Sequence, residues 1–213
     1  MKHIIFVYGT LKTGLHNHHL MTTGSKGHCC YLGTAVTSGK FPLIVATRFN
    51  IPFLLFAPDH GYHVAGELYE VDDAQVAALD KLEGHPHRYE RRRTDVRVTS
   101  GNARDGTPIN KAVENDDPAA LGEANGNFVK TTNCIRNLPL DVSNDVTTKI
   151  DGQVRITAGQ VISAHTYFLV AYQPHLLALP HLVSYDGGFV TPPADASDDL
   201  RRETFREVHT GIQ

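Results

Sequence analysis

The chain has 213 residues, which is enough for one sizeable domain or for one domain with a large insertion. Hydrophobic residues make up 41% of it, which supports a folded core, and a net charge of −3 gives no electrostatic reason to expect binding to nucleic acid or to a membrane surface. No apolar run reaches the roughly 20 residues of a membrane span, and no N-terminal cleavage signal is evident. Three cysteines, two of them adjacent, do not make a disulfide framework. We therefore expect reduced thiols and a cytoplasmic protein. We also expect a monomer.

The first predicted element is a strand at Ile4–Tyr8, which ends at a glycine. Its residues are all β-branched or aromatic, which is typical of a strand covered on both faces. Gly9 permits backbone angles that other residues resist, and it allows a ligand to approach the chain closely. A loop in this place offers backbone N–H groups to an anion. An ordinary strand followed by an ordinary turn explains the same residues.

Further strands and one helix are predicted before residue 100. Gly, Pro and Asn residues separate the strand-like runs, which lie at 29–36, 41–46, 52–57, 64–71 and 89–99. The helix is predicted at residues 73–83, because Asp72 or Asp73 is a good N-cap and the apolar residues that follow have helical spacing. Gly84 supplies the stop signal.

The rest of the chain has a different character. Residues 100–153 are rich in Gly, Asn, Asp and Thr, which predicts a polar insertion. Strand-like sequence resumes at 154–157 and 161–171, and a C-terminal extension follows residue 187. Several strands with a single clear helix predict an α+β fold, with residues 1–213 as one domain.

Several kinds of catalytic site find no support in the sequence. No set of Cys or His residues has the spacing of a structural zinc motif, so we expect polar loop histidines and no metal site. Cys29 and Cys30 fall within a predicted strand, where buried cysteines serve as small apolar residues. There is no nucleophile elbow, phosphate loop or dinucleotide fingerprint. Of the kinds of catalysis considered, acid–base catalysis is the one that remains open.

Glu83 is the carboxylate in the most suggestive place. It occupies the last turn of the predicted helix, at the border of the apolar face. Partial burial and the negative end of the helix dipole should both raise its pKa, as a proton-transferring group at neutral pH requires. A surface glutamate near a helix end is the alternative. Glu67 and Glu70 read as ordinary strand positions, and Arg88 with Arg91–Arg93 reads as a solvated strand edge.

An ordered set of segments covers residues 3–99 almost continuously and resumes from about 160 to 187. In chain order these are Phe6–Lys12, Phe41–Val45, Asn50–Leu55, Val64–Asp72, Leu79–Glu83, Tyr89, Leu179–His181 and Ser184–Asp186. Together they resemble the γ-glutamylcyclotransferase-like family, and most closely its γ-glutamylamine cyclotransferase branch. The insertion at 100–153 and the extension after residue 187 depart from that pattern.

The resemblance implies a small mixed β-barrel or roll with helices packed around it. It implies that Glu83 is the catalytic acid and base, and that the turn after the first strand binds substrate, mainly through backbone groups. The residues expected at the substrate are Tyr8, Gly9, Thr10, Leu11, Tyr89, Ser184 and Tyr185.

The reaction implied by the resemblance needs no cofactor. The α-amine of a γ-glutamyl amine, such as ε-(γ-glutamyl)-lysine, attacks its own γ-amide carbonyl, closes 5-oxoproline and releases the free amine. The only partner implied is this small-molecule substrate. Two alternatives are a cyclotransferase for γ-glutamyl-α-amino acids and a non-catalytic module that binds γ-glutamyl or amino-acid ligands.

Overall fold

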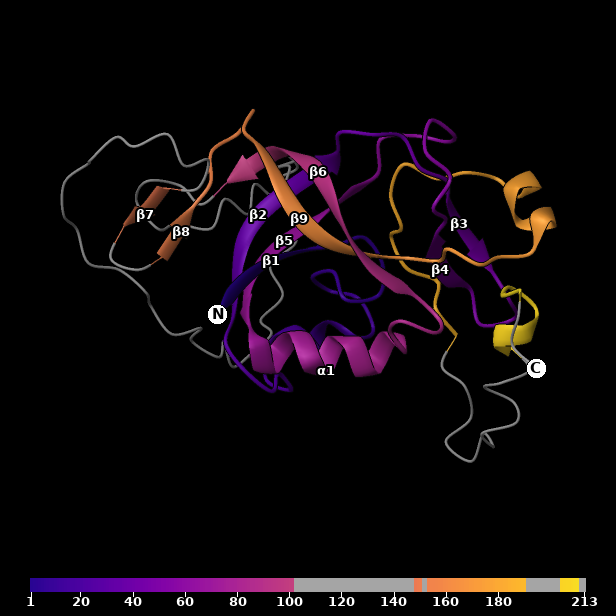
Figure 1. The fold of residues 1–213 in the computed structure, drawn as a ribbon, viewed down its shortest axis with the longest axis horizontal. Helices are drawn as coiled ribbons and strands as arrows, with labels where there is room; N and C mark the ends of the chain where they lie inside the picture. The colour runs from indigo at the N-terminus through magenta and orange to yellow at the C-terminus, as the bar shows by residue number, and fades with distance from the viewer. Residues whose placement is uncertain (102–147, 151–152, 191–203, 211–213) are drawn as a thin grey trace, which may run out of the picture.

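The structure, a computed structural model, describes residues 1–101, 148–150, 153–190 and 204–210 (Figure 1). Most of the predicted insertion at 100–153 and much of the extension after residue 187 lie outside these residues. The described elements are β1 (Lys2–Val7), the short 3-10 helix η1 (His18–Met21), β2 (Cys29–Thr37), β3 (Leu43–Ala46), β4 (Ile51–Leu54), β5 (Ala65–Asp72), α1 (Asp73–Glu83), β6 (Glu90–Gly101), β7 (Thr148–Ile150), β8 (Gln153–Arg155), β9 (Val161–Phe168) and the 3-10 helix η2 (Pro174–Ala178).

Five of the strands close into a barrel in the order β1-β5-β2-β6-β9. The neighbouring pairs are antiparallel except β1 with β9, which is parallel and joins Ile5 to His165. The barrel is therefore mixed, and the fold is α+β as predicted. Figure 1 shows α1 lying along one side of the barrel, with the β3–β4 hairpin and the β7–β8 hairpin at opposite ends. None of the described helices is long and apolar enough to cross a membrane.

Strand alternation in β1 explains its apolar run, Ile4–Val7. Phe6 points into the barrel, where it joins a cluster that includes Leu32, Leu68 and Phe168. Ile5 and Val7 point the other way, into a second cluster that contains the apolar face of α1. Both faces of the strand are buried, which confirms the expectation from its sequence.

Both ends of α1 are fixed by the capping residues that the sequence predicts. The Asp72 side chain accepts a hydrogen bond from the Gln75 amide at 2.9 Å, and Gly84 ends the helix in the left-handed conformation with φ of 64°. Val76 and Leu79 are the apolar residues that this helix buries. The helix therefore has a fixed register against β1 and β5, and Glu83 is its last residue.

Two details differ from the sequence-based expectations. Strand β4 ends at Leu54 and β9 at Phe168, several residues early, because Leu55 and Leu169 form an isolated parallel bridge that joins the two segments. The arginine run is not a solvated edge, since β6 lies between β2 and β9 in a closed barrel. Closure leaves no free edge there.

Candidate active site

A cavity of about 180 Å³ lies where the turn after β1 meets the end of α1. This volume is below the roughly 300–1,000 Å³ of pockets that hold drug-sized ligands, so the cavity suits a group of amino-acid size. Six of the eight residues predicted for the site are on its wall: Tyr8, Gly9, Thr10, Leu11, Glu83 and Tyr89. Segments about 75 residues apart in sequence meet here, because α1 packs across β1 and β5.

Glu83 is partly buried on the wall of this cavity. Burial raises the pKa of its carboxyl to about 7. Within the part of the chain that the structure describes, no side chain or backbone N–H donates a hydrogen bond to this carboxylate. A carboxyl group with this pKa is present as both acid and base at neutral pH, which suits proton transfer in either direction.

Three tyrosines surround the carboxylate of Glu83. Burial raises the pKa of Tyr8, Tyr89 and Tyr167, and the Glu83 charge adds to the rise in each case. The phenols therefore stay protonated at neutral pH and supply no negative charge of their own. The Tyr8 hydroxyl donates a hydrogen bond to the Tyr167 carbonyl at 2.9 Å, which ties the end of β1 to β9. The wall is thus an aromatic surface of low polarity, consistent with the raised pKa of Glu83.

The turn after β1 presents unpaired backbone donors. The Lys12 amide closes the turn on the Gly9 carbonyl at 3.0 Å, and the Asn17 amide donates to the Thr10 carbonyl at 2.9 Å. Among the described residues, no acceptor takes the N–H groups of Gly9, Thr10 or Leu11. Consecutive unpaired N–H groups on a fixed turn can bind an anionic oxygen.

Glycine at position 9 is required by close packing and not by unusual backbone angles. Its φ is outside the left-handed region. A Cβ atom at this position would lie 2.9 Å from Cγ of Pro52 in β4, closer than side chains tolerate. Pro52 is itself on the cavity wall, so the absence of a side chain at Gly9 lets the turn and β4 meet around the cavity.

Ser184 and Tyr185 are not on the wall of the Glu83 cavity. Tyr185 is 1% exposed and belongs to the barrel core, with its hydroxyl donating to the Asn50 carbonyl at 3.2 Å. Ser184 accepts a hydrogen bond from Lys12 Nζ at 2.9 Å. The sequence predicts a substrate contact for Tyr185, whereas the structure buries this side chain in the barrel core. Tyr185 also borders a second hollow, of about 210 Å³, that shares Thr10 and Phe189 with the main cavity.

The other candidate carboxylates have partners of their own. Glu67 accepts hydrogen bonds from the Thr13 amide at 2.9 Å and from the Tyr69 hydroxyl at 2.8 Å. Glu70 is buried and bonds to Lys2 and to His28. Neither glutamate is on the cavity wall. In the described ranges, no group of three or more His, Cys, Asp or Glu side chains is placed to hold a metal ion.

Sequence reasoning missed several residues of the wall. Tyr167 comes from β9, where an alternating strand pattern could have assigned it to the face that packs against α1. Phe189 and Phe205 come from the C-terminal extension, and nothing in their sequence context indicates a site. Phe205 also lies under the Arg88 guanidinium, 4.3 Å from the ring centroid. The extension therefore contributes directly to the cavity.

Cys29 and Cys30 are only partly buried, which corrects the expectation that they are core residues. Neither forms a disulfide within the part of the chain that the structure describes. Burial raises the pKa of the Cys29 thiol to about 12, so it is protonated and unreactive at neutral pH.

Comparisons with known proteins agree with this geometry. A family model described as "Gamma-glutamyl cyclotransferase, AIG2-like" matches residues 5–113. The "Gamma-glutamylaminecyclotransferase" of Rattus norvegicus is 48% identical over 94 residues, which are 44% of this chain and 63% of the rat protein. The "Gamma-glutamylaminecyclotransferase C" of Danio rerio is 39% identical over 104 residues, which are 49% of this chain and 68% of the relative. The chain thus spans less than two thirds of the rat protein's length.

A solved structure extends the likeness beyond the matched segment. The crystal structure of an AIG2-like protein from Mus musculus superposes with a TM-score of 0.62 and 28% identity, and the alignment covers 92% of this chain and 99% of that one. The family match includes the turn after β1, the whole of α1 and Glu83. The chain belongs to the gamma-glutamyl cyclotransferase, AIG2-like family.

Proposed function

We propose that this chain is a γ-glutamylamine cyclotransferase, which converts a γ-glutamyl amine such as ε-(γ-glutamyl)-lysine to 5-oxoproline and a free amine. The observation that carries the proposal is Glu83, a carboxyl with a pKa of about 7 in a small cavity beside a turn with unpaired N–H groups. The names of the rat and zebrafish relatives support the choice of a γ-glutamyl amine as substrate.

The cavity offers complementary groups to the two ends of an amino-acid head. Backbone N–H groups of Gly9, Thr10 and Leu11 suit the α-carboxylate or an oxyanion. The carboxylate of Glu83 suits the α-ammonium. The aromatic wall excludes water and holds the substrate chain folded back, so that amine and carbonyl meet.

Proton transfer by Glu83 completes the reaction. The ionised carboxylate takes a proton from the α-ammonium, because an ammonium has no lone pair with which to attack. The free amine nitrogen then attacks the γ-amide carbonyl carbon, and the new C–N bond closes a five-membered ring. The attacking nitrogen still carries two protons after the ring closes. As the old amide C–N bond breaks, the protonated Glu83 returns its proton to the leaving nitrogen, and the carboxylate then passes the second proton of the ring nitrogen to the released amine, which leaves as an ammonium. Charge and protons balance without a further reactant.

A panel of substrates tests this proposal. Purified protein is incubated with γ-glutamyl amines and with γ-glutamyl-α-amino acids, and released 5-oxoproline is measured. We expect turnover of the amines, and a loss of about 10²–10⁴-fold in Glu83→Gln, the range for a removed acid–base group. Glu207→Gln is the matched control, because Glu207 is exposed and is not on the cavity wall.

The other outcomes favour the alternatives. Preference for γ-glutamyl-α-amino acids would identify the second kind of cyclotransferase. Ligand binding without 5-oxoproline release would identify a binding module. We also propose that the active species is a cytoplasmic monomer that acts on a free small molecule. Sedimentation of the same preparation gives the mass of the active species and tests whether it is a monomer.

A further inference from the structure

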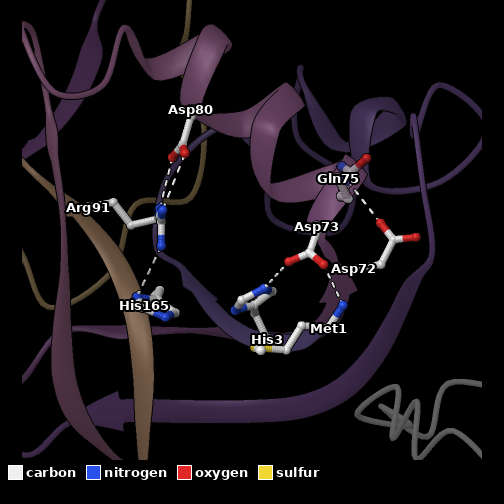
Figure 2. Close-up of polar contacts among 8 residues, drawn as sticks. All are labelled: Met1, His3, Asp72, Asp73, Gln75, Asp80, Arg91 and His165. Atoms are coloured by element: carbon white, nitrogen blue, oxygen red, sulfur yellow. Dashed lines mark hydrogen bonds and ion pairs between the residues drawn. The ribbon is translucent and has the colours of Figure 1, made fainter.

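Asp80 lies one helical turn before Glu83 and is the centre of a polar network that ends at the cavity. Its carboxylate accepts a hydrogen bond from the Tyr167 hydroxyl at 2.7 Å. It also accepts from Arg91, through Nε at 2.9 Å and Nη2 at 3.3 Å. Figure 2 shows this two-pronged contact, with Arg91 reaching onward to His165 Nδ1 at 3.4 Å. Arg91 and Tyr167 are register partners across β6 and β9, which places both beside α1.

The network fixes the direction of the Tyr167 hydroxyl. Burial alone would raise the pKa of Asp80, but the hydrogen bonds from Arg91 and Tyr167 outweigh it and lower the pKa below its usual value. An ionised carboxylate can only accept, so the phenol must donate its single proton to Asp80. The Tyr8 hydroxyl likewise donates its proton, to the Tyr167 carbonyl. The Tyr8 oxygen also accepts a hydrogen bond from the Leu54 backbone. The Tyr167 oxygen can still accept one from a donor in the cavity.

An α-ammonium carries three N–H donors and needs acceptors in a site that excludes water. Glu83 supplies one, and Tyr167 shares its cavity. We propose that Asp80 and Arg91 are positioning residues, which hold the Tyr167 phenol as a hydrogen-bond acceptor for the α-ammonium of the substrate. This role rests on the proposed cyclotransferase activity.

Replacement of the carboxylate by an amide should weaken the hold on the phenol. Oδ1 accepts from both the Tyr167 hydroxyl and Arg91 Nε, so in Asp80→Asn the amide oxygen takes this position and the NH₂ group faces Arg91 Nη2. The phenol then donates to a neutral acceptor, and its own oxygen becomes a poorer acceptor for the ammonium than when it is bonded to an anion. The effect of Asp80→Asn therefore depends on the hydroxyl of Tyr167, whereas a purely structural role of Asp80 does not.

A double-mutant cycle measures that dependence. KM and kcat for ε-(γ-glutamyl)-lysine are measured for wild type, Tyr167→Phe, Asp80→Asn and the double variant. Tyr167→Phe should raise KM about ten- to hundredfold, the value of a hydrogen bond to a charged group, with a smaller change in kcat. Asp80→Asn should raise KM by a smaller factor, because the phenol oxygen is still present. The double variant should be no worse than Tyr167→Phe alone. Asp73→Asn is the control, because it makes the same exchange at the other end of α1, where Asp73 contacts His3 and the N-terminal amine (Figure 2). It should leave KM unchanged.

Two results would overturn the positioning role. One is a folded Tyr167→Phe protein with wild-type KM. This result can be obtained even if the Asp80 variants do not fold. The other is a double variant whose loss is the product of the two single losses. Failure of the cyclotransferase proposal looks different, since wild type itself would then release no 5-oxoproline. Calorimetric titration with the same compound would still decide whether Tyr167→Phe weakens binding in that case.

Discussion

Replacement of Glu83 by glutamine should make the protein more stable at alkaline pH and leave it unchanged at acidic pH. The pKa of Glu83 is about 7 in the folded protein and 4.5 in a solvated carboxyl. A pKa difference of one corresponds to 1.36 kcal/mol, so the folded state pays about 3 kcal/mol to hold this carboxylate ionised. The free energy of unfolding of wild type is therefore unaffected by this group below about pH 4.5, where the carboxyl is protonated in both states. It falls between about pH 4.5 and 7, and the Glu83 contribution does not change further above pH 7. Glutamine carries no charge at any of these pH values, so the variant does not lose this stability as the pH rises.

The prediction is tested by urea unfolding at pH 4 and pH 8, followed by far-UV circular dichroism because the chain has no Trp. At pH 8 the variant should exceed wild type by about 3 kcal/mol, or about 6–12 °C in Tm for a domain of this size. At pH 4 the two should coincide. Other titrating groups are common to both proteins and cancel in the difference. Equal stability at pH 8, or a destabilised variant, would show that Glu83 is not held in an unfavourable site, and Glu207→Gln reports any effect of the exchange itself.

Four further outcomes are expected. Gly9→Ala should lower both kcat/KM and Tm, because the new methyl group meets Pro52 at 2.9 Å and must displace the cavity wall; wild-type kinetics and stability would contradict this. Tyr185→Phe should cost about 1 kcal/mol of unfolding free energy for the lost hydrogen bond and leave KM unchanged, whereas a changed KM at constant stability would support the sequence-based prediction of a substrate contact. Phe205→Ala should expose Glu83 to water, lower its pKa and move the acidic limb of the pH–rate profile to lower pH, which a profile identical to wild type would refute. Turnover should survive chelation with EDTA, since lactam closure requires only proton transfer and hydrogen bonds.

The local elements could be predicted from sequence because their signals are local. Asp72 and Gly84 mark the ends of α1 by side-chain capping and left-handed backbone, which depend on nearby residues alone. The apolar run of β1 likewise predicts burial on two faces. The closure of the barrel could not be predicted in this way, since it joins Ile5 to His165 across most of the chain. No periodicity within either strand specifies that partner.

In the candidate site, too, the features set by nearby residues could be predicted and those set by distant residues could not. The position of Glu83 at a helix end bordering an apolar face suggested a raised pKa, and the structure supplies the burial that raises it. Alternation along β9 could assign Tyr167 to the face that packs against α1, but not to the cavity wall. Its place there, like that of the phenylalanines from the extension, depends on how distant segments pack around α1. Tyr185 shows the opposite error, since a motif next to loop-like sequence turned out to be part of the core.

Two carboxyl groups on α1, those of Asp80 and Glu83, have pKa values shifted in opposite directions. Asp80 and Glu83 are three residues apart, so they lie on neighbouring turns of the same face of α1. Asp80 meets a guanidinium and a phenol that stabilise its charge, and its pKa falls. Glu83 meets no donor among the described residues and is enclosed by aromatic rings, and its pKa rises. Paired environments that separate two pKa values are how a site assigns one group to stay ionised and another to exchange protons. Because the caps fix the register of α1, the structure supports a role for Asp80 in holding the wall and for Glu83 in moving the proton.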